Sequence, residues 1–265
     1  MSRTVLAAID LGPSSARVLY HAAGFARLMS ASLKVLHVTG DPGPDDVARV
    51  LDFCAQEGPY EIDLMEEDVI VRSGRVSDAI YREAERQKAA LVVMGSRGHG
   101  GLTRLLLGSS SEAVLQNAAT PVLLVPPIDI DIVNIADRAT LSCGPVLAAV
   151  ELEADTGGQL RLAGDLAAMA GQPWTMMTVA PRSVDEHAAA TELRERAHQM
   201  TANKPHSLIV RRGRVADEIS RCALTEGAGL VVMGLRERAK GRPGAVASSV
   251  LATKRAFVLA VPGSR

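Results

Sequence analysis

The sequence predicts an α/β protein made of two tandem copies of a doubly wound, five-stranded parallel sheet with helices on both faces. Three observations lead to this fold class. The chain has 265 residues, whereas about 150 residues are typical of a single domain. Short apolar runs alternate with helical stretches, which is the pattern of doubly wound α/β proteins. The pattern of the first half then returns in the second half.

The strands of the first copy are predicted from continuous apolar runs, which are typical of strands buried on both faces of a parallel sheet. These runs are residues 5–9, 33–38, 69–71, 91–94 and 122–125. The stretches between them are predicted to be helical. Ser14 or Ser15 is positioned to cap the first helix, and another helix is expected to begin near Ser77.

The second copy is identified by laying the chain on itself. The matching segments are VLAAID at 5–10 and VLAAVE at 146–151, VRSGRVSDAI at 71–80 and VRRGRVADEI at 210–219, LVVMG at 91–95 and at 230–234, and TPVLLVP at 120–126 and AFVLAVP at 256–262. The shifts are 141, 139, 139 and 136 residues, which indicates one duplicated domain with small loop deletions in the second copy. In that copy, Ser183 and Glu186 have capping-box spacing. We expect domains at residues 1–127 and 144–265.

Residues 127–142 between the copies form the expected linker. The alternation of isoleucine and aspartate from Ile128 to Ile132 is compatible with a short strand that lies against one of the domains. The two copies differ in charge: residues 1–127 hold 12 Lys and Arg against 15 Asp and Glu, and residues 144–265 hold 16 against 12. Opposite net charges favour docking of the copies, although salt screens exposed charges. An acidic partner is the alternative reason for the basic excess of the second copy.

Composition excludes several function classes. A net charge of −1, with only three Phe, three Tyr and one Trp, gives neither electrostatic nor stacking grounds for binding nucleic acid. No stretch approaches the ~18 apolar residues of a membrane span, and the N-terminal apolar run is too short for a secretory signal. The three cysteines are scattered without a CxxC pair, which argues against a disulfide framework and a thiolate zinc site. We therefore expect a soluble, cytoplasmic protein without a membrane partner.

The segment that carries chemistry follows the fourth apolar run. Gly95 is followed after two residues by Gly98, and after nine more by Gly108-Ser109. Glycines let backbone N–H groups approach an anion closely, and the helix expected after Ser111 adds a favourable dipole. The segment is neither a Walker A loop nor a GxGxxG fingerprint. The alternative interpretation is an ordinary glycine-rich loop.

The spacing G-x2-G-x9-G-S resembles the ATP-binding motif of the universal stress protein family, here in a tandem two-domain form. The flanking segments are similar as well: Ile9-Asp10, Leu36-His37-Val38, Met94-Gly95 and the closing run PVLLVP. The resemblance covers nearly all of the first copy and, less faithfully, the second. It implies a strand order of 3-2-1-4-5 in each copy, and it implies ATP as the ligand, with Mg²⁺ as an optional companion of the phosphates.

The resemblance also implies the site, at the switch point where strands one and four adjoin and ligands bind outside the strand ends. Adenine would lie against Ala8, Ile9 and Val38, the ribose and adenine edge would meet Asp10, Met94 and Gly95, and the phosphates would meet Gly98, Gly108, Ser109 and Ser110, with Arg97 within reach. A turn-capping role is the alternative for Asp10, and a solvated loop position is the alternative for Arg97. His37 is expected to be structural.

The second copy departs from this pattern. Its loop is three residues shorter, Glu237 stands in place of the second glycine, Ala245 in place of Ser109, and Glu151 in place of Asp10. A carboxylate at position 237 would repel a phosphate. Four basic residues crowd the same loop, namely Arg236, Arg238, Lys240 and Arg242. The pattern favours a decayed site with a solvated basic loop, and a site retuned for another anion is the alternative.

These observations favour an ATP-binding regulatory or stress-response protein, in which the nucleotide acts as a switch or sensor with little or no turnover. The six histidines show no metal-ligand spacing, and no GxSxG elbow is present, so neither catalytic residues nor a metal site are predicted. Two alternatives stay open: an enzyme that transfers adenylyl or phosphoryl groups, and a nucleotide-free interaction module. The protein partner through which such a switch would act is unknown.

The closing runs at residues 121–125 and 257–261 are apolar and are expected at the edge of each sheet. An apolar edge strand invites pairing, and covalent duplication supplies the partner at high effective concentration. The resemblance points the same way, because single-domain relatives pair through their last strands. We expect the two closing strands to meet antiparallel within one chain, as a pseudo-twofold dimer of domains. A homodimer in which two chains exchange these contacts stays open.

Overall fold

The computed structural model describes residues 3–59, 62–97, 107–135, 139–200, 202–235 and 244–263. The N-terminal half holds β1 (Thr4–Ile9), α1 (Ser15–Leu28), β2 (Ser32–Thr39), α2 (Asp46–Glu57), the short 3-10 helix η1 (Glu66–Asp68), β3 (Val69–Ser73), α3 (Val76–Arg86), β4 (Ala89–Gly95), α4 (Ser109–Asn117) and β5 (Val122–Val125). The C-terminal half holds β8 (Val146–Ala149), α5 (Gly157–Ala170), β9 (Trp174–Val179), α6 (Glu186–Gln199), β10 (Ser207–Arg211), α7 (Val215–Thr225), β11 (Leu230–Leu235), α8 (Ala245–Ala252) and β12 (Phe257–Pro262). Between the halves lie β6 (Val133–Asn134) and β7 (Thr140–Leu141).

Ten strands form one sheet in the order β3-β2-β1-β4-β5-β12-β11-β8-β9-β10. Within each half all neighbouring strands are parallel. The order 3-2-1-4-5 therefore occurs twice, once from each edge of the sheet inward. The predicted fold class is confirmed, and both halves have a switch point between their first and fourth strands.

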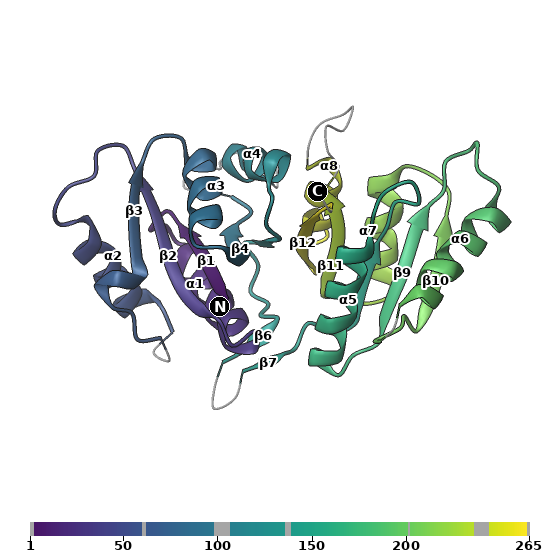
Figure 1. Ribbon diagram of the computed structural model, residues 1–265, viewed down its shortest axis with the longest axis horizontal. Helices are drawn as coiled ribbons and strands as arrows, with labels where there is room; N and C mark the ends of the chain where they lie inside the picture. The colour runs from purple at the N-terminus through teal and green to yellow at the C-terminus, as the bar shows by residue number, and fades with distance from the viewer. Residues whose placement is uncertain are drawn as a thin grey trace.

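The two halves meet through β5 and β12, which pair antiparallel with Leu124 opposite Val258 and Leu123 opposite Leu259. All four residues of β5 and the first five of β12 are buried. Figure 1 shows the halves side by side on either side of this joint. The expected antiparallel meeting of the closing strands within one chain is confirmed, so neither strand is left as an exposed edge.

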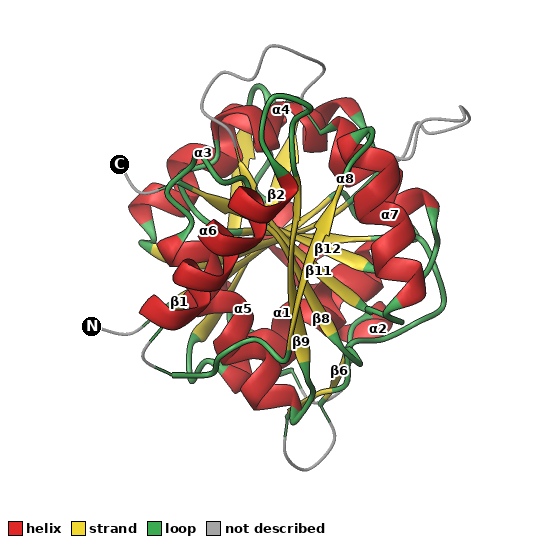
Figure 2. Ribbon diagram, turned by 90° about the vertical axis from the view of Figure 1, so that its right-hand side faces the viewer, coloured by secondary structure: helices red, strands yellow, loops and turns green. Residues whose placement is uncertain are grey.

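Helices cover both faces of the twisted sheet, as the view in Figure 2 shows. Side chains along β1 alternate between two buried clusters, with Val5 and Ala7 in one and Leu6 in the other. The first cluster includes side chains of α1, α2, α5 and α6, and the second includes side chains of α3, α4, α7 and α8. The loops at the carboxyl ends of the parallel strands are thus held between two packed layers.

The linker lies against α1, but the isoleucine–aspartate alternation, which is compatible with a strand, does not form one. Residues 128–132 are not in a strand, and β6 and β7 instead form a two-stranded antiparallel ribbon. Two side chains of α1 form hydrogen bonds with the backbone of the linker. Arg17 donates to the carbonyl of Ile130, and the N–H of Ile132 donates to Nε2 of His21 at 3.4 Å. A Cβ on Gly24 would lie 2.6 Å from Cγ2 of Val133, so a glycine in α1 lets the ribbon approach.

The predicted helix caps also differ in detail. The N-cap of α6 is Asp185 rather than Ser183, and its carboxylate accepts from the N–H of Ala188 at 3.1 Å. In the first helix, Ser14 is the N-cap residue but makes no side-chain capping bond, and the hydroxyl of Ser15 donates to Asp10 at 3.0 Å. A carboxylate thus replaces the serine as the cap of α6, whereas α1 has no side-chain cap.

Candidate functional site

The carboxyl ends of three adjacent strands bring the predicted adenosine residues to one edge of the sheet. In the register of β1 and β4, Ala8 lies opposite Met94, and in that of β1 and β2, Ile9 lies opposite His37. Asp10, Gly95 and Val38 come directly after these residues in the three strands. The structure thus brings together all the residues that the resemblance assigned to adenine and ribose.

Asp10 holds the turn from β1 into α1. Its Oδ1 accepts from the N–H of Gly12 at 3.0 Å and from the hydroxyl of Ser15 at 3.0 Å. Leu11 between them has a φ of 58°, in the left-handed region. The turn role considered for Asp10 is therefore present, and since the side chain is exposed it also borders the switch point.

The ends of the glycine-rich segment are tied together beside β4. The N–H of Gly108 donates to the carbonyl of Ser96 at 2.7 Å, and the hydroxyl of Ser111 donates to the carbonyl of Gly95 at 2.9 Å. A Cβ on Gly95 would lie 3.0 Å from the carbonyl oxygen of Arg97, so this turn is tight for any other residue. These bonds hold Gly95 and Gly108, the first and last glycines of the motif, close together at the end of β4.

The N-terminus of α4 opens at this point. Gly108 is its N-cap residue, and Ser109 and Ser110 form the start of the first turn. Among the described residues, the hydroxyls of these two serines have no hydrogen-bond partner. The helix dipole and the unpaired N–H groups of a first helical turn favour an anion. The arrangement can therefore accept the negative oxygens of a phosphate.

Two buried polar atoms at the start of the segment have no partner among the described residues: the hydroxyl of Ser96 and the Nε of Arg97. Ser96 is fully buried. A buried donor without a partner is unfavourable by about 1–3 kcal/mol, so a partner for these two groups would stabilise the segment. Ser96 is not among the residues predicted from the sequence; its place between Gly95 and Arg97 in the motif is the signal that could have identified it.

Some predicted residues lie outside the described part of the chain. These are Gly98, which the resemblance assigned to the phosphates, and the residues named in the second loop, Arg236, Glu237, Arg238, Lys240 and Arg242. His37 is structural, as expected: it is buried, and its Nδ1 lies 3.1 Å from the carbonyl oxygen of Ile9. The described residues contain no cluster of three or more His, Cys, Asp or Glu suited to a metal ion. Nor do they contain a helix long and apolar enough to cross a membrane.

The C-terminal half has the same frame with other side chains. In the register of β8 and β11, Ala149 lies opposite Met233, and Glu151 follows β8 after one residue. Gln159 is buried beneath this edge, and its amide donates to the carbonyls of Ala149 at 2.8 Å and Val232 at 3.1 Å. Helix α8 begins with alanine and valine rather than serines.

The model of the universal stress protein family matches residues 1–126. A universal stress protein of Thermus aquaticus, encoded 3' of QAH/OAS sulfhydrylase, is 34% identical over 137 residues, which cover 47% of this chain and 99% of the relative. A universal stress protein of Mycolicibacterium smegmatis is 34% identical over 134 residues, 46% of this chain and 45% of the relative.

Two solved structures resemble the whole chain. A universal stress protein from Archaeoglobus fulgidus superposes with a TM-score of 0.73 at 21% identity, covering 100% of this chain and 97% of that one. A putative universal stress protein from Pseudomonas aeruginosa gives a TM-score of 0.68 at 21% identity, covering 99% and 94%. At such identities the likeness shows that the fold is shared over nearly the whole length of both chains.

Proposed function

The chain belongs to the universal stress protein family, and on that premise we propose that its N-terminal half binds ATP as a switch or sensor with little or no turnover. One observation carries this proposal: polar groups without partners gather where the glycine-rich segment leaves β4 and enters α4. They are the buried hydroxyl of Ser96, the Nε of Arg97 and the hydroxyls of Ser109 and Ser110, described above. An anion at this helix terminus accepts hydrogen bonds from the two serine hydroxyls of α4 and from the free N–H groups of its first turn.

The residues present fit an adenine nucleotide. Adenine is assigned to Ala8, Ile9 and Val38, the ribose to Asp10, Met94 and Gly95, and the phosphates to Arg97, Gly98, Gly108, Ser109 and Ser110, as the resemblance implies. Strand ends at a switch point are where nucleotides bind in doubly wound folds. Mg²⁺ needs no protein cage beside phosphates, so the lack of a carboxylate cluster among the described residues is compatible with Mg-ATP.

Bound ATP supplies binding free energy to one conformation of the chain, and a ligand shifts a conformational equilibrium only by its preference for one state. In this proposal the chain itself orients the phosphates and holds the adenosine, and the favoured conformation is what a protein partner recognises. The two proposed domains, residues 1–127 and 144–265, then divide the work between a nucleotide-binding part and a second part joined through β5 and β12.

The cysteines support placing this function in the reducing cytoplasm. All three, Cys54, Cys143 and Cys222, are buried free thiols. Burial raises the pKa of each thiol to about 11, which disfavours the reactive thiolate.

The experiment is calorimetric titration of the full chain with ATP and with Mg-ATP, beside mass spectrometry of the native protein for a co-purified nucleotide. The proposal expects saturable binding, and it expects Ser109→Ala combined with Ser110→Ala to weaken that binding. A chain that binds neither form of ATP at millimolar concentration contradicts the proposal. Single-turnover assays with labelled ATP test the second part: fast hydrolysis or transfer of a phosphoryl group would mean an enzyme instead.

A further inference from the structure

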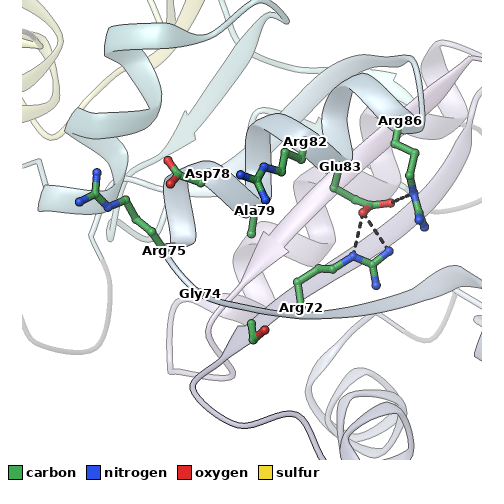
Figure 3. A pocket seen from close by; sticks show the side chains of 9 residues that line it. Arg72, Gly74, Arg75, Asp78, Ala79, Arg82, Glu83 and Arg86 are labelled. Carbon is green, nitrogen blue, oxygen red and sulfur yellow. Dashed lines mark hydrogen bonds and ion pairs between the residues drawn. The ribbon is translucent and has the colours of Figure 1, made fainter.

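A cluster of arginines with an excess of positive charge lies at the outer edge of the N-terminal half, beside the edge strand β3. A pocket of about 360 Å³ opens there between the end of β3 and α3, and its lining follows α3 as far as the last residue of the helix, Arg86. Its wall is dominated by arginines, as Figure 3 shows: Arg72, Arg75, Arg82 and Arg86, with Gly74 and Ala79. Its size falls in the lower part of the range of small-molecule sites, about 300–1,000 Å³.

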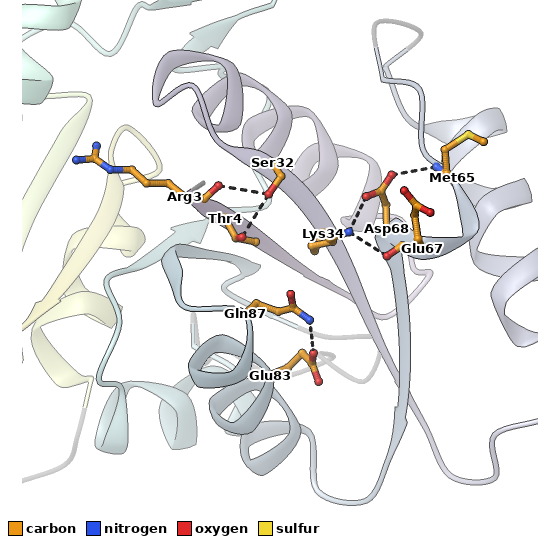
Figure 4. Close-up of polar contacts among 9 residues, drawn as sticks. All are labelled: Arg3, Thr4, Ser32, Lys34, Met65, Glu67, Asp68, Glu83 and Gln87. Carbon is orange, nitrogen blue, oxygen red and sulfur yellow. Dashed lines mark hydrogen bonds and ion pairs between the residues drawn. The ribbon is translucent and has the colours of Figure 1, made fainter. Parts of the chain in front are cut away.

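A buried carboxylate fixes two of the arginines. Glu83, only 2% exposed, accepts from the Nε of Arg72 at 3.1 Å and of Arg86 at 3.1 Å. The amide of Gln87 donates to the same carboxylate at 2.8 Å, as Figure 4 shows. The Nη2 of Arg72 lies 3.0 Å from it as well. Arg86 uses only its Nε in these bonds, so its outer N–H groups stay available to a ligand at the pocket.

The other two arginines have no ion-pair partner in the described part of the chain; these are Arg75 and Arg82, both exposed. The pocket also contains one further carboxylate, that of Asp78. Four arginines against Asp78 and Glu83 leave a net charge of +2. Guanidinium groups are the side chains best suited to oxyanions, because their forked N–H donors bind two oxygens at once.

The backbone leaves room beside these donors. Gly74 has a φ of 100°, and a Cβ placed on it would meet nothing within 4 Å. Helix α3 begins two residues later, at Val76, so the positive end of its dipole borders the same space.

The C-terminal half contains the matching turn and shows what fills it. Gly213, Arg214 and Arg221 correspond to Gly74, Arg75 and Arg82, while Glu218 corresponds to Ala79. The carboxylate of Glu218 accepts from the Nη1 of Arg221 at 2.7 Å, and its Oε1 lies 2.9 Å from the position of a Cβ on Gly213. The chain thus places its own anion beside the glycine in one half. In the other half alanine leaves that position empty and the arginine unpaired.

We propose that the pocket between β3 and α3 binds a small, multiply charged oxyanion of the phosphate type. The net charge of +2 favours such an anion over a single carboxylate, which would leave the pocket still positive. Arg75, Arg82 and the outer N–H groups of Arg86 bind its oxygens, Glu83 positions Arg72 and Arg86, and Asp78 opposes binding. The pocket shares no lining residue with the ATP site, although Arg72 lies opposite Val38 in the register of β2 and β3, so the two sites are neighbours.

The experiment is calorimetric titration of the full chain with inorganic pyrophosphate, first alone and then with the ATP site saturated. Arg75→Ala and Arg82→Ala are each expected to weaken binding about tenfold, the effect of one charge-assisted hydrogen bond. Asp78→Asn is expected to strengthen it. Ala79→Glu, which introduces the carboxylate of the C-terminal half, is expected to abolish it. Arg49→Ala, on α2 at the opposite face, makes the same change of charge and is the matched control.

Unchanged affinity in folded Ala79→Glu overturns the proposal. If that variant does not fold by circular dichroism, the Arg75→Ala, Arg82→Ala double variant decides, and wild-type affinity in it overturns the proposal equally. Complete loss of pyrophosphate binding in the presence of ATP also overturns it, because the anion would then occupy the ATP site. ATP affinity measured on the same variants is expected to stay unchanged, so failure here leaves the proposed nucleotide function standing.

Discussion

At the edge where the parallel strands end, the two halves of the molecule place different side chains on one backbone frame. In the N-terminal half, Val18 lies 3.9 Å from the position of a Cβ on Gly95; in the C-terminal half, Gln159 lies 3.1 Å from the same position on Gly234. The Val18 side chain cannot donate a hydrogen bond. The amide of Gln159, in contrast, donates to two strand carbonyls, those of Ala149 and Val232. A polar side chain, Gln159, therefore occupies in the C-terminal half the position that the apolar Val18 occupies in the N-terminal half.

The helices that follow differ in the same direction. Helix α4 begins with three serines, and α8 begins with Ala245 after a glycine in the left-handed region. Strand order is nevertheless the same in both halves, and matching residues pair across their strands, apart from an irregularity between Thr4 and Val5 in β1. The fold depends on the apolar periodicity, which both copies keep, while the chemistry of the switch point depends on a few side chains that only one copy keeps. The comparison therefore yields tests of each half and of the joint between them.

The largest effect is expected at the joint. Leu124 is fully buried in β5, between β4 and β12. Leu124→Pro removes a backbone donor from the middle of the ten-stranded sheet and is expected to destabilise the chain by about 3 kcal/mol or more. Leu124→Met keeps the volume and should lose less than about 1.5 kcal/mol. Denaturant unfolding measures both, and near-equal stabilities would mean that the halves do not depend on this strand pair.

A titratable group at the same joint is expected to make stability depend on pH. His21 of α1 is fully buried against the ring of Phe257 in β12, with ring centroids 4.7 Å apart. Burial lowers its pKa from 6.5 to about 4, against the opposing influence of the Arg17 carbonyl and of Asp131. The N–H of Ile132 donates to Nε2, so a proton there would remove an acceptor.

The unfolded chain binds a proton at His21 below about pH 6.5, and the folded chain does so only below about pH 4. The contribution of neutral His21 to the free energy of unfolding is therefore fully present above pH 6.5. It is lost as the pH falls from 6.5 to about 4, by about 3 kcal/mol in total. His21→Leu removes this dependence, so the difference between the two unfolding profiles isolates the histidine. Parallel profiles from pH 7 to pH 4 would contradict the assignment.

The contrast between the two glycine-rich segments predicts one ATP per chain, bound in the N-terminal half. Gly98→Val is expected to weaken ATP binding about 100-fold, equivalent to about 3 kcal/mol, because a side chain would intrude where backbone must approach the phosphates. Glu237→Val, at the matching position of the C-terminal half, is the control and should change nothing. Two equivalent ATP sites in a calorimetric titration would contradict this prediction. Equal effects of the two variants on ATP affinity would contradict it as well.

The fold could be predicted from the sequence because its signals are redundant. Four segments of the first copy, at 5–10, 71–80, 91–95 and 120–126, return in the second copy, so the strand pattern of each copy supports that of the other. The site was predictable only where residue type and spacing define it, as with Gly108 and Ser109. Ser96 was missed because its importance lies in a hydroxyl buried without a partner, and burial of a single loop residue leaves no pattern in a sequence.

The sequence predictions differ from the structure where side chains form hydrogen bonds with backbone groups. The isoleucine–aspartate alternation of the linker is compatible with a strand, but Arg17 and His21, more than 100 residues earlier in the chain, bind its carbonyl and N–H instead. The cap of α6 was placed two residues early, because Ser183 and Asp185 are both good N-cap residues and only the bond to Ala188 distinguishes them. The Ala79 and Glu218 difference was visible in the aligned repeat, but its meaning required the pocket.

The smallest predicted effect tests whether the two glycine-rich segments are mechanically coupled. Gly244, the N-cap residue of α8, has a φ of 75°, and a Cβ on it would lie 2.4 Å from Cδ2 of Leu107, the residue before Gly108. Gly171 has a similar φ of 60°, but nothing lies within 4 Å of its Cβ position. Gly171→Ala is therefore expected to show backbone strain alone, about 1 kcal/mol. Gly244→Ala should lose about 1 kcal/mol more, since Leu107 must leave its rotamer, and should also weaken ATP binding slightly. Equal stability losses and unchanged ATP affinity in both variants would mean that the C-terminal half does not influence the site of the other.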